Sequence, residues 1–220
     1  MGALACLACA SALAASTTFT KTQAATLARA VNLRSADLPG YASAPNPNTA
    51  SSVAAGNQLA RCTGGVTSNR QLVDVNSPLF SKGSTQSELQ FSSNVVVLPL
   101  SSLVQRDLNA LRSSRGQSCL RSFVSSTLKQ AASNGVKFGS ATISRLSVPA
   151  HGTSGTFGVR VTSTATEGAV RLTFYVDLLG GAVGHAEVSL DVLGLSQPAP
   201  SATEQHLFTL LVGRADAAKH

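Results

Sequence analysis

The sequence predicts an α+β protein, with an antiparallel sheet of about five strands, helices packed on its apolar face and a C-terminal helix. Apolar residues recur at helical spacing in the first part of the chain, but from residue 139 onward they alternate with polar residues. Another helical stripe follows two prolines near the C-terminus. Alternation on one face is typical of antiparallel strands with one covered side, so the helices are expected on that side.

The helical stretches differ in how well their ends are marked. The glycine pair at 64–65 is a stop signal for the helix that carries Cys62. Ser201 and Glu204 have the spacing of a capping box at the start of the last helix. The predicted helices cover residues 22–33, 52–62, 101–114 and 118–135 and a segment that begins at Ser201.

The strands are predicted from residues that alternate between apolar and polar. A strand at 88–99 is expected to be interrupted at 92–94, where two serines and an asparagine follow one another. The predicted strands cover residues 88–99, 143–149, 156–162, 169–178 and 185–193.

The last two strands are expected to pair as a hairpin. Each has its apolar residues at even numbers, so a loop of odd length, Gly180 to Ala182, is predicted to join them. This register sets Arg171 opposite Asp191, Asp177 opposite His185, and Tyr175 beside Glu187. Opposite charges that face each other across a hairpin contribute up to about 1 kcal/mol.

Two cysteines, Cys62 and Cys119, lie in or beside predicted helices. If the chain is exported, an oxidising compartment favours a disulfide between them. Two alternatives remain open, a pair of buried free thiols and a reactive Cys119 near a helix start between Arg115 and Arg121. We predict the disulfide.

The first residues resemble a secretory leader. Residues 3–15 are apolar and end in Ala-Leu-Ala, although the basic segment that usually precedes such a run is missing. Cys6 and Cys9 lie within it, and lipidation of either would tether the chain to a membrane. We expect a leader at 1–22, one α+β domain at 23–215 and a frayed tail at 216–220, in a secreted protein or an anchored lipoprotein.

The formal net charge of +7 raises the question of nucleic-acid binding. The arginines are scattered, and aromatic residues are only 5% of the chain, whereas nucleic-acid binders concentrate their basic residues on one face. No nucleic-acid partner is therefore expected. Weak binding to an anionic polymer of the cell envelope remains an alternative, which clustered arginines and a steep salt dependence would support.

The sequence contains no catalytic, nucleotide or metal-binding fingerprint. His151, His185 and His206 form no zinc motif, so no metal and no cofactor are expected. The glycine-rich stretch at 151–158 contains Ser154, but no strand–turn–helix context exposes that hydroxyl as a nucleophile. We predict a protein without enzymatic activity. The alternative is a hydrolase or transferase with a loop-borne site near His151 and Ser154.

Several segments resemble small secreted proteins and lipoproteins of actinobacterial type. These are "NLRSADLPGY", the cysteine segments "LARCTGG" and "SCLRSFV", and a strand-rich second half that ends in one helix. Their order is similar to the PsbP/Mog1-like fold, an antiparallel sheet between helices. The resemblance implies a binding or assembly protein and transfers no catalytic residue.

The polar face of the predicted sheet is the expected ligand or partner surface. Its partner would be a small molecule, an envelope polymer or a protein. The surface comprises Arg160, Arg171, Thr173, Tyr175, Asp177, His185, Glu187 and Asp191.

Overall fold

The computed structural model describes residues 19–84, 87–131 and 137–218. The predicted leader and its two cysteines, Cys6 and Cys9, lie largely or wholly outside these residues, so the leader and the lipid anchor stay predictions. Within the described part of the chain, no helix is both long and apolar enough to cross a membrane.

The described residues form an antiparallel sheet of nine strands, more than the five expected, and the α+β class is confirmed. The strand order is β1-β3-β4-β9-β8-β7-β5, while β2 also pairs with β4 and β6 with β7. The strands are β1 (Ala42–Ala44), β2 (Val73–Asn76), β3 (Leu79–Lys82), β4 (Leu89–Val97), β5 (Lys137–Phe138), β6 (Thr142–Arg145), β7 (Thr156–Glu167), β8 (Val170–Val183) and β9 (Ala186–Leu195).

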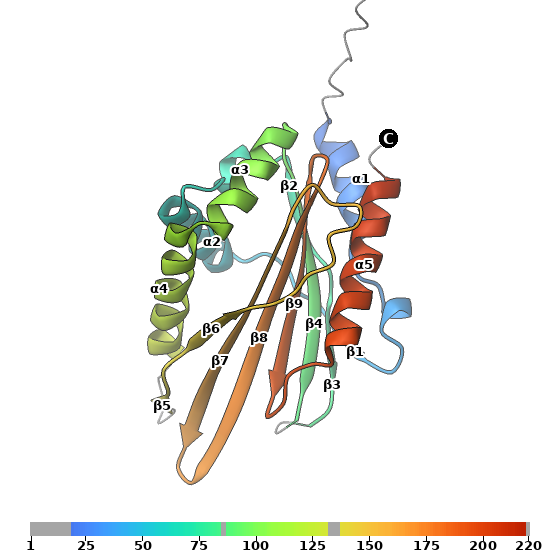
Figure 1. The fold of residues 1–220 in the computed structure, drawn as a ribbon. Coiled ribbons are helices and arrows are strands. Elements are labelled where there is room, and N and C mark those ends of the chain that lie inside the picture. Colours follow the sequence, from blue (N-terminus) through green and yellow to red (C-terminus); the bar gives the residue numbers. More distant parts are fainter. Residues whose placement is uncertain (1–18, 85–86, 132–136, 219–220) are drawn as a thin grey trace, which may run out of the picture.

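Helices cover both faces of this sheet rather than one (Figure 1). α1 and α5 lie together on one face, whereas α2, α3 and α4 form a layer over the other. Both faces are therefore partly apolar, and the molecule has three layers. The helices are α1 (Lys21–Val31), α2 (Ala50–Thr63), α3 (Ser101–Arg112), α4 (Ser114–Ala131) and α5 (Ser201–Ala217).

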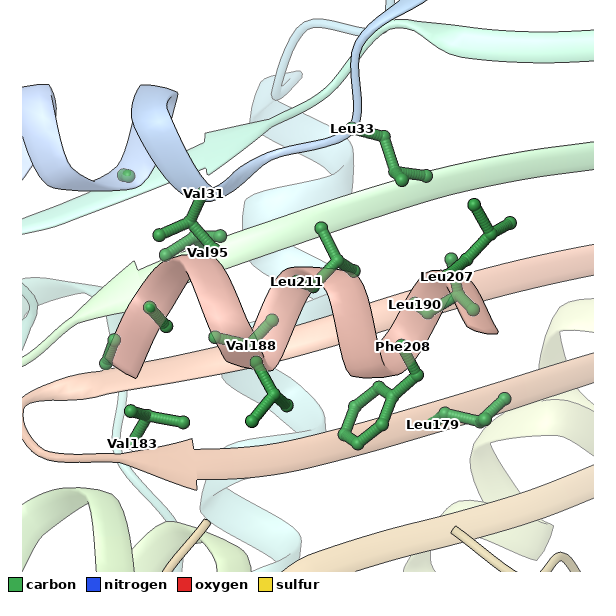
Figure 2. Close-up of a cluster of buried hydrophobic side chains, with 14 of the residues drawn as sticks. Val31, Leu33, Val95, Leu179, Val183, Val188, Leu190, Leu207, Phe208 and Leu211 are labelled. Atoms are coloured by element: carbon green, nitrogen blue, oxygen red, sulfur yellow. The ribbon is translucent and has the colours of Figure 1, made fainter. Parts of the chain in front are cut away.

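The main hydrophobic core lies between the sheet and the α1–α5 layer. In Figure 2, Phe208 and Leu211 of α5 lie over the valines and leucines of β8 and β9. Phe208 and Leu211 are fully buried. A smaller cluster fills the upper part of the opposite face, where Val104 of α3 and Ala182 of β8 are also fully buried.

The hairpin of β8 and β9 differs from the predicted register. Gly184 and His185 form a two-residue turn, because Val183 pairs directly with Ala186. Gly184 has φ 57°, which glycine adopts without the cost that a side chain adds and which suits the first position of a tight hairpin turn. The shift reverses the parity of β8, so that the odd-numbered Leu179 and Val183 lie in the main core and Ala182 lies in the smaller cluster on the opposite face.

This register removes the charge pairs predicted across the hairpin. Asp177 lies opposite Val192, and Asp191 lies opposite Leu178. The prediction was wrong because the glycines at 180 and 181 belong to the strand, whereas the turn uses Gly184. The strand has a glycine at position 181 because Phe208 packs closely above it. A Cβ there would lie 2.9 Å from the Phe208 ring.

The expected interruption of the fourth strand is also absent, since β4 continues through residues 92–94. Ser93 is buried, but its polar atoms are satisfied. Its hydroxyl donates to Asn32 Oδ1 at 2.8 Å and accepts from the Leu33 N–H at 2.9 Å. A buried serine in a strand is stable when its hydrogen bonds are made. This pairing also attaches the end of α1 to the sheet.

Cys62 and Cys119 form the predicted disulfide, which joins α2 to α4. Thr63 is the only buried residue of helix α2. The helix therefore depends on the disulfide for its attachment to the rest of the fold. The helix ends as expected at Gly64, which is in the left-handed region at φ 85°. Removing a crosslink over 57 residues is expected to cost about 4 kcal/mol in the chain-entropy model.

Replacing both cysteines, Cys62→Ala with Cys119→Ala, should lower the free energy of unfolding by about 3–4 kcal/mol. The unfolded chain then gains the freedom that the crosslink removes. Urea unfolding followed by circular dichroism measures the change. The matched control compares the double variant with wild type, both under reducing conditions. Their free energies of unfolding should agree. Equal stability of the variant and the oxidised wild type would contradict the prediction.

Candidate functional site

The structure does not bring the eight residues of the expected surface onto one face. Because of the changed register, those of β7 and β8 lie on the α1–α5 face, and those of β9 lie under α2–α4. His185 belongs to the turn, where its Nδ1 lies 3.1 Å from the Leu98 carbonyl oxygen. The first group comprises Arg160, Arg171, Thr173, Tyr175 and Asp177, and the second comprises Glu187 and Asp191.

Asp177 is neutralised within the fold by Arg160, its direct neighbour on β7. Arg160 Nε donates to Asp177 Oδ1 at 2.7 Å, and a second bond runs from Nη2 to Oδ2. Glu204 of α5 is buried beside this pair, with Oε1 3.8 Å from Arg160 Nη2. Glu204 is thus a core residue, and the expected capping box is not formed, since α5 has no side-chain cap.

The charges of Arg160, Asp177 and Glu204 are balanced within this cluster. Burial raises the pKa of Glu204 to about 8, and the neighbouring Asp177 adds to the effect. The carboxyl therefore holds its proton at neutral pH, and one arginine then balances one aspartate. Two hydrogen bonds from a guanidinium to a carboxylate fix their mutual geometry, so this pair links β7 to β8, and Glu204 of α5 packs beside it.

The two residues of the alternative catalytic hypothesis are held in a surface loop. Ser154 is exposed, accepts a hydrogen bond from the Gln105 side chain and donates to the Ala182 carbonyl oxygen at 3.3 Å. His151 is exposed in the preceding turn. Neither residue lines the cavity described next.

A cavity of about 210 Å³ lies between the sheet and the α2–α4 layer. An adjoining hollow of about 230 Å³ shares Leu59, Val96, Asp107, Leu111 and Glu187 with it and continues beneath α2. The cavity wall is mostly aliphatic and aromatic. Its apolar side chains include Leu59, Val96, Leu108, Leu111, Leu120, Phe157 and Leu178.

Small residues of β8 leave room for this cavity. Gly180 and Ala182 point to the same side of the sheet as Leu178, between Phe157 of β7 and Ser189 of β9. A Cβ at Gly180 would meet Phe157 at 3.8 Å, an ordinary van der Waals distance, so a side chain could fit there. The space is thus present because glycine occupies position 180.

Three carboxyl groups reach this largely apolar cavity. Asp107 projects from α3, and Glu187 and Asp191 project from β9. Burial, together with the nearby carboxyls of Asp107 and Asp74, raises the pKa of Glu187 to about 9. Burial alone raises the pKa of Asp191 to about 6. At neutral pH Glu187 is therefore protonated and Asp191 is mostly ionised.

The glycine pair that ends α2 positions Asp107. The Val66 N–H donates to Asp107 Oδ1 at 2.7 Å. Gly65 passes so near that a Cβ on it would lie 2.1 Å from the same oxygen, so any larger residue would displace the Asp107 carboxylate. Burial raises the pKa of Asp107, although this backbone hydrogen bond opposes the effect. The "GG" at 64–65 thus stops a helix and also leaves space for a carboxylate.

Sequence reasoning found Glu187 and Asp191 but assigned them to an open polar surface. Asp107 was missed, because on the predicted helix it is one polar residue among several. The signal that could have identified the cavity is the run of small residues at 180–182 in an otherwise bulky strand. Within the described residues, no three His, Cys, Asp or Glu side chains are grouped closely enough to hold a metal ion.

No family model and no curated protein matches the sequence. Among solved structures, the chain is similar to the extracellular domain of PknH from Mycobacterium tuberculosis, with a TM-score of 0.43 and 10% identity. That match covers 91% of this chain and 98% of the other. At this level of likeness it carries no argument about function, and the resemblance to the PsbP/Mog1-like layout stays a prediction.

The raised pKa values of Glu187 and Glu204 predict how stability depends on pH. Both groups have an ordinary pKa of 4.5, against about 9 and about 8 in the folded protein. Between these values the folded state binds more protons than the unfolded chain, so the free energy of unfolding should fall as the pH rises from about 5 to about 8. Glu187→Gln and Glu204→Gln should each reduce this slope, as measured by urea unfolding across that range.

Glu88→Gln is the matched control, because Glu88 lies outside both the cavity and the Arg160 cluster. It should leave the slope as in wild type. If the slope is unchanged in both Glu187→Gln and Glu204→Gln, these two carboxyls are not the groups that hold the extra protons in the folded state.

Proposed function

We propose that this protein is an extracytoplasmic, disulfide-stapled binding module without enzymatic activity, and that it holds an apolar small molecule between its sheet and the α2–α4 layer. The observation that carries the proposal is the cavity of about 210 Å³, lined mainly by leucine, valine and phenylalanine side chains. An engineered apolar cavity of about 150 Å³ holds a molecule as large as benzene. Binding sites for small molecules are usually apolar hollows with few polar groups.

The position of the cavity supports this proposal. It lies where two layers of the fold meet, and one of those layers is joined by the Cys62–Cys119 disulfide. The crosslink limits how far α2 and α4 can separate, so the wall above the cavity keeps its shape. A preformed site loses less conformational freedom when a ligand binds, which favours affinity.

The disulfide also supports an extracytoplasmic location, because such bonds form and persist in oxidising compartments. A binding role accounts better for the cavity than catalysis does. The wall is mainly hydrocarbon, and the His151–Ser154 loop of the hydrolase alternative does not line it.

Filling the cavity tests the proposal. The uncharged fluorophore N-phenyl-1-naphthylamine should bind to the wild-type protein with increased emission. In Gly180→Val its affinity should fall at least about fivefold, because the added side chain takes volume that the probe needs, and overpacking of this kind costs about 1–3 kcal/mol. Fluorescence titration measures the dissociation constant.

Gly213→Ala is the matched glycine control, because position 213 on α5 is exposed and a Cβ there has no neighbour within 4 Å. It should bind the probe as wild type does. Equal binding by Gly180→Val and wild type, with both folded by circular dichroism, would place the probe elsewhere and refute the cavity as the site.

A further inference from the structure

Resting on the proposed binding function, we infer that the ligand is an organic cation, an amine whose ammonium group pairs with Asp191 and whose hydrocarbon part lies along the leucines of the cavity. The inference specifies the chemical class of the ligand. It depends on how the acidic residues of the central strands are, or are not, neutralised by the protein itself.

Asp177 shows how this sheet neutralises a buried acid, and Asp191 can be compared with it. Its side chain is almost fully buried, and Arg160 on the adjacent strand forms two hydrogen bonds with it. A carboxylate removed from water costs several kcal/mol unless such a partner is present. On the α1–α5 face, the fold supplies Arg160 as this partner.

Asp191 has no such partner. Its neighbours on the adjacent strands are Ser92 of β4 and Leu178 of β8, neither of which carries a charge. Among the residues that the structure describes, its carboxylate accepts no hydrogen bond and forms no ion pair, and the helices facing this part of the cavity contribute leucines. Asp191 is half-buried rather than fully buried, so its carboxylate stays open to water and to one positive charge from outside the chain.

Glu187, toward the hairpin turn, differs from Asp191, because its carboxyl is protonated at neutral pH and shares a side-chain hydrogen bond with Asp107. Its neighbours are Val96 and Ala182, and its Oε1 is buried without a hydrogen-bond partner. The charged groups nearest to it are the acids Asp107 and Asp74, so no cation of the chain serves this end either. Glu187 and Asp191 are four residues apart on one strand, which corresponds to about 13 Å.

The wall between these two acids is mostly apolar, although Ser189 of β9 and Asn94 of β4 also line it. Leu111, Leu120 and Phe157 line it, with Gly180 and Ser189 on the sheet. A ligand that follows this wall from Asp191 toward Glu187 therefore needs a cationic end and a hydrocarbon body. A metal ion would need several ligands gathered at one point, and no such group exists within the described residues.

The experiment compares octylamine, 1-octanol and octanoate by isothermal titration calorimetry with the full chain at about pH 7.5. The three probes share one hydrocarbon chain and differ in charge. Octylamine should bind about tenfold or more tightly than octanol, because hydrogen bonds to a charged group are stronger than neutral ones, and octanoate should bind most weakly.

Asp191→Asn should remove the preference for the amine, weakening octylamine about tenfold while leaving octanol unchanged. The variant should fold, since asparagine keeps the shape and avoids a buried charge. Glu88→Gln is the control and should bind all three probes as wild type does. Lowering the pH to about 5 should weaken octylamine alone, because protonation of Asp191 removes its charge.

The outcomes separate the two proposals. If octanol binds as tightly as octylamine and Gly180→Val weakens both, the cavity is a binding site but the cationic ligand class is wrong. If octylamine binding is the same in Asp191→Asn as in wild type, the assignment of the ammonium to Asp191 is wrong. If none of the probes, including the uncharged fluorophore, binds to the wild-type protein, both proposals fail.

Discussion

The pairing of β8 with β9 through the turn at Gly184 and His185 is the constraint on which the other layers depend. A shift of one residue in this register would exchange the two faces of β8. The observed register sets Leu179 and Val183 under α5, and Gly180 and Ala182 under α3. It also brings Asp177 beside Arg160 on the next strand. The core, the ion pair and the cavity therefore share one cause.

The two faces of the sheet differ in how completely they are filled. On the α1–α5 face, Phe208 packs directly on Gly181, and Asp177 has Arg160 as its partner. Arg214 of α5 likewise pairs with Asp37, at 2.8 Å from Nη1 to Oδ2. The opposite face has a cavity in which Glu187 and Asp191 form no ion pair with a cation of the described residues. Tight packing and neutralised charge favour stability, so the unfilled face is where binding is proposed.

The helical layer over the cavity is held differently from α5. Helix α5 buries a continuous stripe of large side chains, whereas α2 buries little and is attached through a disulfide and the short turn at Gly64 and Gly65. Such a layer can leave space beneath it, because its position does not depend on filling that space. The same turn positions Asp107 at the cavity through the Val66 N–H.

The sequence by itself determined the local structure, and only the tertiary structure decided which faces meet. Apolar residues at helical spacing and strict alternation are local signals, so the α+β class, most helices and the Cys62–Cys119 pair could be predicted. The number of strands, the parity of β8 and the burial of Glu204 could not, because each depends on contacts between distant segments. Glu187 and Asp191 illustrate the difference. Alternation alone marks them as polar and outward-facing, but a second layer of helices over that face makes the same positions the wall of a cavity. Burial under that layer raises the pKa of both carboxyls, and the sequence alone does not show this burial.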